Sequence, residues 1–172
     1  IMQDTIPVKY NTNRFRSSLE AWGKDLRFWM RFPTRQGEVV TVKTAVSAVS
    51  SDGAKLNMQE LEGKTFASLK AEGEKLWEGQ LSKFKIEATP EQRETFYTSV
   101  YHAFLHPFIF QDADGKFREL DKNIGQAEGF TNYTVFSLWD TYRALHPLFN
   151  LVQRDINADI VNSMLAHYDK SV

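Results

Sequence analysis

The chain of 172 residues contains no cysteine. Disulfide bonds and thiolate metal sites are therefore excluded, because both need the sulfur of that residue. The absence leaves the cellular compartment open. Glycine-rich phosphate loops are also missing, and no serine lies in a Gly-x-Ser-x-Gly elbow, so nothing in the sequence supports serine-nucleophile chemistry.

Long hydrophobic runs are absent as well. No apolar stretch approaches the roughly 18 residues that a membrane-spanning helix needs, and the opening Ile1-Met2 is not followed by a charged and then apolar leader. The net charge is −1, with acidic and basic residues mixed along the chain, which is not the basic footprint of a nucleic-acid-binding protein. We expect a soluble piece of a longer or processed protein, with no nucleic-acid partner and no membrane span.

The N-terminal part has the pattern of a β-structure. Residues 1–24 are polar and irregular and predict short edge strands or loop. Leu26 to Phe32 and Val39 to Val49 both alternate apolar and polar side chains, and Pro33 and Gly37 between them are typical of a turn. The sequence therefore predicts an antiparallel hairpin, which needs further strands because two strands alone are marginal in water.

From about residue 60 the apolar period changes from two to three and four. Residues 66–84 predict a surface helix after a connector at 50–63. Thr89, Pro90 and Gln92 form the pattern of a capping box with proline at the first helical position, and they predict a helix that ends near Pro107. Residues 158–168 predict a last amphipathic helix.

The segment around Asp112, Asp114 and Gly115 has the start of a calcium-loop pattern. The further oxygen ligands and the closing glutamate are missing. A polar turn in which glycine adopts a positive φ is the better interpretation.

The chain is organised around YTVFSLWDTYRALHPLF at 133–149. Asp140 and Arg143 lie three residues apart, on one side of a helical turn, directly after Trp139. An indole can stack on the C–H groups of a sugar while the charged groups bind its hydroxyls. A core helix with an internal ion pair would produce the same spacing, and Pro147 predicts a break near His146 or two short helices.

These residues resemble glycoside hydrolase family 92, the bacterial α-mannosidases. Three further segments fit the same family in the same order, so that the resemblance covers about residues 25 to 169: VKTAVSAVSSDGAKLNMQEL (42–61), FYTSVYHAFLHPFIFQDADGKFREL (96–120) and INADIVNSMLAHYD (156–169). The resemblance implies an α+β chain by segment, with antiparallel β-sandwich strands followed by linker helices and the first helices of an (α/α)6 barrel. The implied domains are a partial sandwich at 1–58, a linker helix at 59–88 and the start of the catalytic barrel at 89–172.

The resemblance also implies a calcium-dependent, exo-acting, inverting α-mannosidase that takes terminal mannose from glycans. The implied residues that bind terminal mannose are Trp139, Asp140 and Arg143, with possible loop contacts from Asp112 and Asp114. The general acid, the general base and most calcium ligands of such enzymes lie C-terminal to this segment, so no catalytic residue and no metal ligand is assigned here. We expect the segment alone to be inactive, and the enzyme to be periplasmic, cell-surface or extracellular in a bacterium.

Two other interpretations stay open from the residues alone. The chain could be a non-catalytic helical module that binds carbohydrate or another protein, which the lack of a carboxylate pair of about 6.5–9.5 Å favours. It could also be a structural scaffold without a ligand. The scaffold interpretation predicts that Trp139 and Asp140 are fully buried and satisfy one another.

Overall fold

The computed structural model describes a mixed helical chain with small antiparallel sheets. The described residues are 2–3, 6–7, 24, 26–27, 32–134 and 137–171. The chain forms two compact units, Ile1–Thr41 and Val42–Val172. Residues 42–58, expected in the sandwich part, therefore belong to the same unit as the helices. The division into sandwich, linker and barrel remains a prediction.

The first unit contains a three-stranded antiparallel sheet. Its strands are β1 (Met2–Gln3), β2 (Ile6–Pro7) and β3 (Leu26–Arg27), in the order β2-β1-β3. Met2 lies opposite both Pro7 and Arg27. The N-terminal residues thus add strands to β3, which is one of the alternatives that the sequence left open. Positions 28–31 of the strand predicted from Leu26 to Phe32 lie outside the described residues.

The predicted strand from Val39 to Val49, and with it the predicted hairpin, is wrong. Residues 38–50 are irregular, and both Val39 and Val46 are 85% exposed. The alternating valines supply strand propensity, but a strand is stable only when its backbone groups pair with a neighbouring strand. Residues 32–37 contain a tight turn at Gly37, whose φ is +83°, and none of the described strands pairs with residues 39–49.

The predicted connector at 50–63 is helical. It contains α1 (Ser51–Met58) and the 3-10 helix η1 (Gln59–Leu61). Ser50 caps α1, because its side chain accepts a hydrogen bond from the backbone of Gly53. The sequence analysis took residues 50–63 as a connector, and Ser50 in the capping position was the signal for a helix.

The next two helices confirm the sequence prediction. α2 spans Phe66–Leu81 and α3 spans Pro90–Phe104. A capping box starts each of them: Thr65 with Ser68 in α2, and Thr89 with Gln92 in α3. Both boxes satisfy orphan amides of the first turn within four residues of chain, which is why the starts are readable from sequence.

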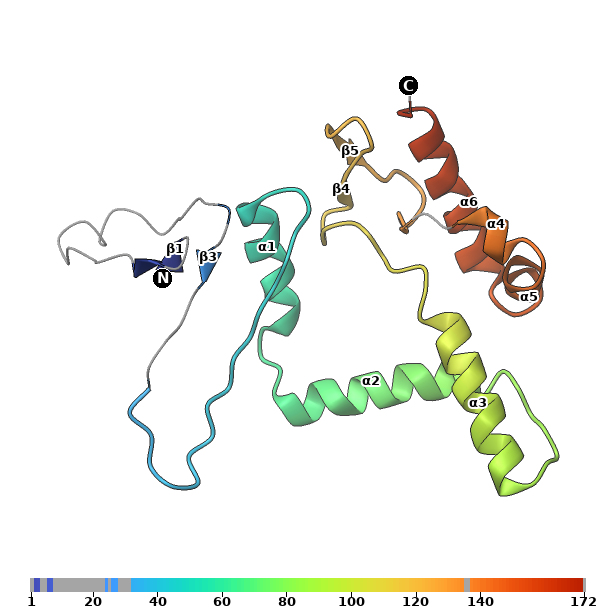
Figure 1. Ribbon diagram of the computed structural model, residues 1–172, viewed down its shortest axis with the longest axis horizontal. Helices are drawn as coiled ribbons and strands as arrows, with labels where there is room; N and C mark the ends of the chain where they lie inside the picture. Colours follow the sequence, from blue (N-terminus) through green and yellow to red (C-terminus); the bar gives the residue numbers. More distant parts are fainter. Residues whose placement is uncertain are drawn as a thin grey trace. The chain divides into compact units, whose positions relative to one another are not determined.

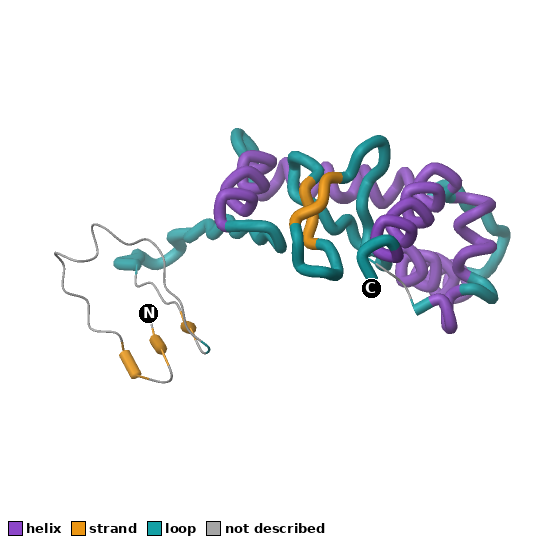
Figure 2. The backbone as a smooth tube through the Cα atoms, turned by 90° about the horizontal axis from the view of Figure 1, so that it is seen from above, coloured by secondary structure: helices purple, strands orange, loops and turns teal. Residues whose placement is uncertain are grey.

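A tight β-hairpin follows α3. Its strands β4 (Lys116–Arg118) and β5 (Ile124–Gln126) pair in antiparallel fashion, with Phe117 opposite Gly125 (Figure 2). Gly115 stands directly before β4 with a φ of +82°. The polar turn with a glycine at positive φ is therefore confirmed.

Three helices complete the chain. They are α4 (Leu138–Thr141), α5 (Leu145–Val152) and α6 (Arg154–Tyr168). The two short helices confirm the effect of Pro147, which takes the third position of α5 instead of the first. α6 begins four residues earlier than predicted, and α5 and α6 lie side by side (Figure 1).

The buried core of the described part is small. Its buried hydrophobic residues come from α3, β4, α5 and α6: Val100, Phe117, Phe149 and Ile160. No helix among the described residues combines the length and the apolar character that crossing a membrane requires.

Candidate functional site

The α4 turn, which we define as Trp139, Asp140 and Arg143, lies open to solvent. Trp139 is 88% exposed, and the other two side chains are also exposed. Within the described residues no ion pair joins Asp140 to Arg143. The core-helix and scaffold interpretations, which required buried and mutually satisfied side chains, are therefore wrong for these residues.

The exposure follows from the shortness of α4. With four residues it has a single turn, closed by hydrogen bonds such as that from Tyr142 N to Leu138 O at 3.1 Å, and its N-cap Ser137 makes no side-chain bond to it. One turn has too little surface to bury an apolar stripe. Indole, carboxylate and guanidinium therefore stay available to a ligand.

An extended segment precedes the turn and pairs with the chain that follows α3. Ile109 and Tyr133 form an antiparallel bridge. The amide of Phe110 donates to Asn132 O at 2.8 Å, and that of Thr134 donates to Phe108 O at 2.9 Å. Residues 132–134 are thus paired with residues 108–110, a contact that was not predicted from the sequence.

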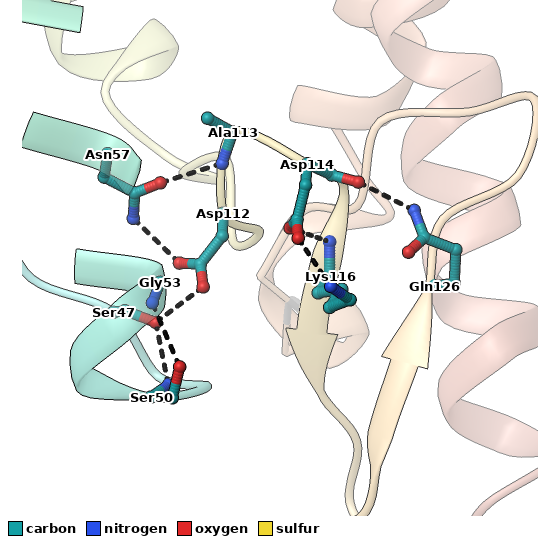
Figure 3. Close-up of polar contacts among 9 residues, drawn as sticks. All are labelled: Ser47, Ser50, Gly53, Asn57, Asp112, Ala113, Asp114, Lys116 and Gln126. Atoms are coloured by element: carbon teal, nitrogen blue, oxygen red, sulfur yellow. Dashed lines mark hydrogen bonds and ion pairs between the residues drawn. The ribbon is translucent and has the colours of Figure 1, made fainter. Parts of the chain in front are cut away.

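Asp112 lies in a buried polar cluster and is 5% exposed. Figure 3 shows its carboxylate between Ser47 and Asn57. Ser47 Oγ donates to Oδ2 at 2.6 Å, and Asn57 Nδ2 donates to Oδ1 at 2.8 Å. Asn57 Oδ1 in turn accepts the amide of Ala113 at 2.8 Å. These bonds join α1 and the irregular segment before it to the start of the hairpin.

Both carboxylate oxygens of Asp112 are therefore engaged within the chain. The loop contact with a ligand that was predicted for Asp112 remains untested, and the observed bonds describe a structural role. Sequence reasoning missed Asn57 and Ser47, because 55 and 65 residues separate them from their partner and no local pattern links them.

Asp114 is differently placed, at the exposed end of the same loop. Lys116 Nζ lies 2.7 Å from its carboxylate. The hydrogen bond from the Lys116 side chain, together with that from the Lys116 backbone, lowers the pKa of Asp114, and the same contact raises the pKa of Lys116. The carboxylate is therefore ionised at neutral pH and partly screened by its partner, and its contact with a ligand stays a prediction.

A calcium site needs several oxygen donors around one point. In the described parts of the chain, no three histidine or acidic side chains gather closely enough to hold a metal ion. Calcium therefore stays a prediction of the family resemblance.

A separate cavity of about 400 Å³ lies between α2, α3 and the two last helices. Its lining is mostly apolar and includes Trp77, Phe104 and Phe149. No member of the α4 turn lines it. Its walls lack the carboxylate pair that glycoside chemistry needs.

The chain is similar to solved structures of one enzyme family. The family GH92 alpha-mannosidase BT3965 from Bacteroides thetaiotaomicron is 70% identical over 99% of this chain, with a TM-score of 0.92. The structure of that enzyme in complex with mannoimidazole matches with the same identity, coverage and score. The gh92 family glycosyl hydrolase ccman5 is 27% identical over 68% of the chain and 16% of its own length, with a TM-score of 0.64.

The chain spans 23% and 22% of the lengths of the two alpha-mannosidase structures. No curated protein matches it. The family profile described as the glycosyl hydrolase family 92 catalytic domain matches residues 53–172, which is more than half of the chain. The four segments that suggested the resemblance are thereby confirmed, and the chain belongs to glycosyl hydrolase family 92.

Proposed function

We propose that the chain is part of an exo-acting, inverting, calcium-dependent α-mannosidase that removes terminal α-linked mannose from glycans. The observation that carries the proposal is the 70% identity over 99% of the chain to a family GH92 alpha-mannosidase. In this proposal the first unit contributes to a β-sandwich, and the helices from α3 onward begin an (α/α)6 barrel.

The α4 turn supplies the binding of the terminal mannose. Its exposed indole, Trp139, stacks on the C–H groups of the pyranose, which is the geometry that an aromatic ring offers to a sugar. Asp140 accepts hydrogen bonds from sugar hydroxyls and Arg143 donates to hydroxyl oxygens, and both bonds are charge-assisted. The mannoimidazole complex of the similar enzyme supports a mannose-like ligand.

The general acid and base come from residues outside this chain. Inversion needs two carboxyl groups about 6.5–9.5 Å apart, one protonated and one ionised. Asp112 is already bonded to Ser47 and Asn57, and Asp114 is paired with Lys116. The segment therefore binds and orients the sugar, and by itself it releases no mannose.

Substitution of Asp140 tests this assignment. The protein used is the chain extended through the rest of its catalytic domain. We expect Asp140→Ala to lower kcat/KM for an α-linked mannobiose by about 10- to 100-fold, because a hydrogen bond to a charged group contributes about 1.5–3 kcal/mol. Asp155→Ala, an exposed carboxylate of α6, is the matched control and leaves kcat/KM unchanged.

Two outcomes count against the proposal. Full activity of Asp140→Ala removes the α4 turn from the site. An extended wild-type protein that binds mannose in a calorimeter but releases none would instead support a non-catalytic carbohydrate-binding module. We also propose export to the periplasm, cell surface or medium of a bacterium, which fractionation of the producing cells tests.

A further inference from the structure

One face of α6 carries a row of polar residues that contacts the extended segment before α4. The row consists of Asp159, Ser163 and His167, at a spacing of four, so the three side chains lie one above another on the helix. Ser163 is 1% exposed and His167 is 6% exposed. Buried polar groups on a helix are costly unless they are hydrogen-bonded, so their partners indicate their role.

Two members of this α6 row, Asp159 and Ser163, bond to the backbone of the same short segment. Asp159 Oδ2 accepts the amide of Thr131 at 3.1 Å, and Ser163 Oγ accepts the amide of Tyr133 at 2.9 Å. His167 lies one turn further along the helix and packs its ring edge-on against Phe117, with ring centroids 5.8 Å apart. Asp159 and Ser163 thus accept the alternate backbone amides of Thr131 and Tyr133.

The opposite edge of this segment is held by the ladder to residues 108–111. Asn132, which is fully buried, donates its side-chain amide to Phe110 O at 2.7 Å and its backbone amide to Gln111 Oε1, also at 2.7 Å. Residues 131–134 are therefore fixed from both sides, with the ladder on one edge and the α6 row on the other.

Contacts of this kind determine register. A slip of one residue along a strand moves the chain by about 3.3 Å and reverses the face of every side chain. α4 begins four positions after Thr134 and has no side-chain cap of its own. Its position therefore depends on where residues 131–134 are held and on α5, whose Phe149 is buried.

We propose that Asp159 and Ser163 are positioning residues for the mannose-binding turn. They act through the backbone of residues 131–133 and touch no substrate. The register in which they hold residues 131–133 sets where Trp139 and Asp140 lie. This inference rests on the proposed function of the α4 turn and names residues that the sequence analysis treated only as a plain amphipathic helix.

Kinetics of Ser163→Ala in the extended protein test the inference. The hydroxyl that accepts the amide of Tyr133 is removed, and we expect KM for α-linked mannobiose to rise about tenfold with a smaller change in kcat, because displacement of a group by about 1 Å costs up to about 10²-fold. Asp159→Asn keeps an acceptor oxygen for Thr131 and stays within about twofold of wild type.

Two controls separate positioning from a general loss of stability. Val100→Ala creates a cavity in α3, away from the row, so it lowers the melting temperature but leaves KM unchanged. Asn162→Ala changes an exposed neighbour of Ser163 on the same helix and changes neither quantity. If Ser163→Ala gives no folded protein, Asp159→Ala is measured in its place.

Hydrogen exchange gives a readout that does not depend on activity. In Ser163→Ala we expect faster exchange in peptides covering 131–134 and also in those covering 137–143, whereas Val100→Ala accelerates neither selectively. If the wild type cleaves no α-mannoside, the proposed function fails but the exchange still decides this inference. The inference is overturned if Ser163→Ala leaves KM unchanged and shows the same hydrogen exchange as Val100→Ala. It is also overturned if neither Ser163→Ala nor Asp159→Ala folds.

Discussion

Trp139 and His167 reverse the usual placement of aromatic and polar groups. The large apolar ring is 88% exposed, whereas the imidazole is 6% exposed. Large aromatic side chains are mostly buried and histidine is intermediate, so an exposed tryptophan beside two charged groups is informative. Trp139 is the residue to which the proposed function gives the sugar contact, and His167 lies on the helix that bonds to residues 131–133.

His167 predicts a dependence of stability on pH. Burial lowers its pKa below the ordinary value of 6.5, against the opposing effects of its bond to Tyr133 and the charge of Glu119. The unfolded chain therefore binds more protons than the folded one in the window just below 6.5, and the free energy of unfolding falls as the pH falls through it. Protonation would also charge Nδ1, which is buried without a hydrogen-bond partner.

Chemical denaturation of the extended protein between about pH 5 and 8 measures this effect. We expect His167→Gln to flatten the decline of unfolding free energy below pH 6.5. The exposed His102→Gln should leave the decline as in wild type. A decline that is the same in the His167 variant and in wild type would contradict the assignment.

Elements differ in whether they depend on local or distant contacts. α2 and α3 begin at capping boxes made of residues three apart. α1 instead packs its first turn against Asp112, which is more than 50 residues away in sequence. A Cβ added at Gly53 would overlap the carboxylate of Asp112 and would lie 2.7 Å from Ser47 Oγ. Glycine in α1 is thus a packing requirement of this contact.

Two glycine-to-alanine substitutions separate these cases. Gly79 lies in α2 with open space around its missing Cβ, so Gly79→Ala should stabilise the protein by about 0.5–1 kcal/mol through helix propensity. Gly53→Ala should destabilise it by about 1–3 kcal/mol, because the methyl group overpacks the polar cluster. Thermal unfolding measures the stability of both variants. Stabilisation by Gly53→Ala would show that the polar cluster around Asp112 rearranges to accommodate the methyl group, and would contradict the prediction.

At the scale of the whole molecule, the described part of the chain buries few apolar side chains. The described residues contain four buried hydrophobic residues, while Leu76, Leu151 and Phe66 are exposed. The chain spans only 23% of the similar alpha-mannosidase. In the proposed function this segment contributes to the binding of mannose, and cleavage is expected only of the complete catalytic domain.

Removal of calcium tests the chemistry at that scale. We expect chelation with EDTA to abolish mannose release by the extended protein and added calcium to restore it. Magnesium should not replace it, because that ion demands a smaller and near-octahedral oxygen shell. Unchanged release in EDTA would remove calcium from the proposed mechanism.

Local patterns in the sequence predicted several elements correctly. The capping box at Thr89 and Gln92, the period of residues 66–84 and the break at Pro147 are confirmed. Each depends on interactions within a few residues of chain. The strand predicted at Val39 to Val49 failed because strand formation needs a partner that propensity does not reveal.

By itself, the sequence determined the family, through four ordered segments, and it determined the residues of the α4 turn through their type and spacing. Only the tertiary structure decided that this turn is open to solvent and that Asp112 is bonded to Ser47 and Asn57. It also decided that side chains of α6 accept hydrogen bonds from the backbone amides of Thr131 and Tyr133. The physical reason is that these contacts join residues about 30 to 65 positions apart, and their hydrogen bonds exist only once the chain has folded.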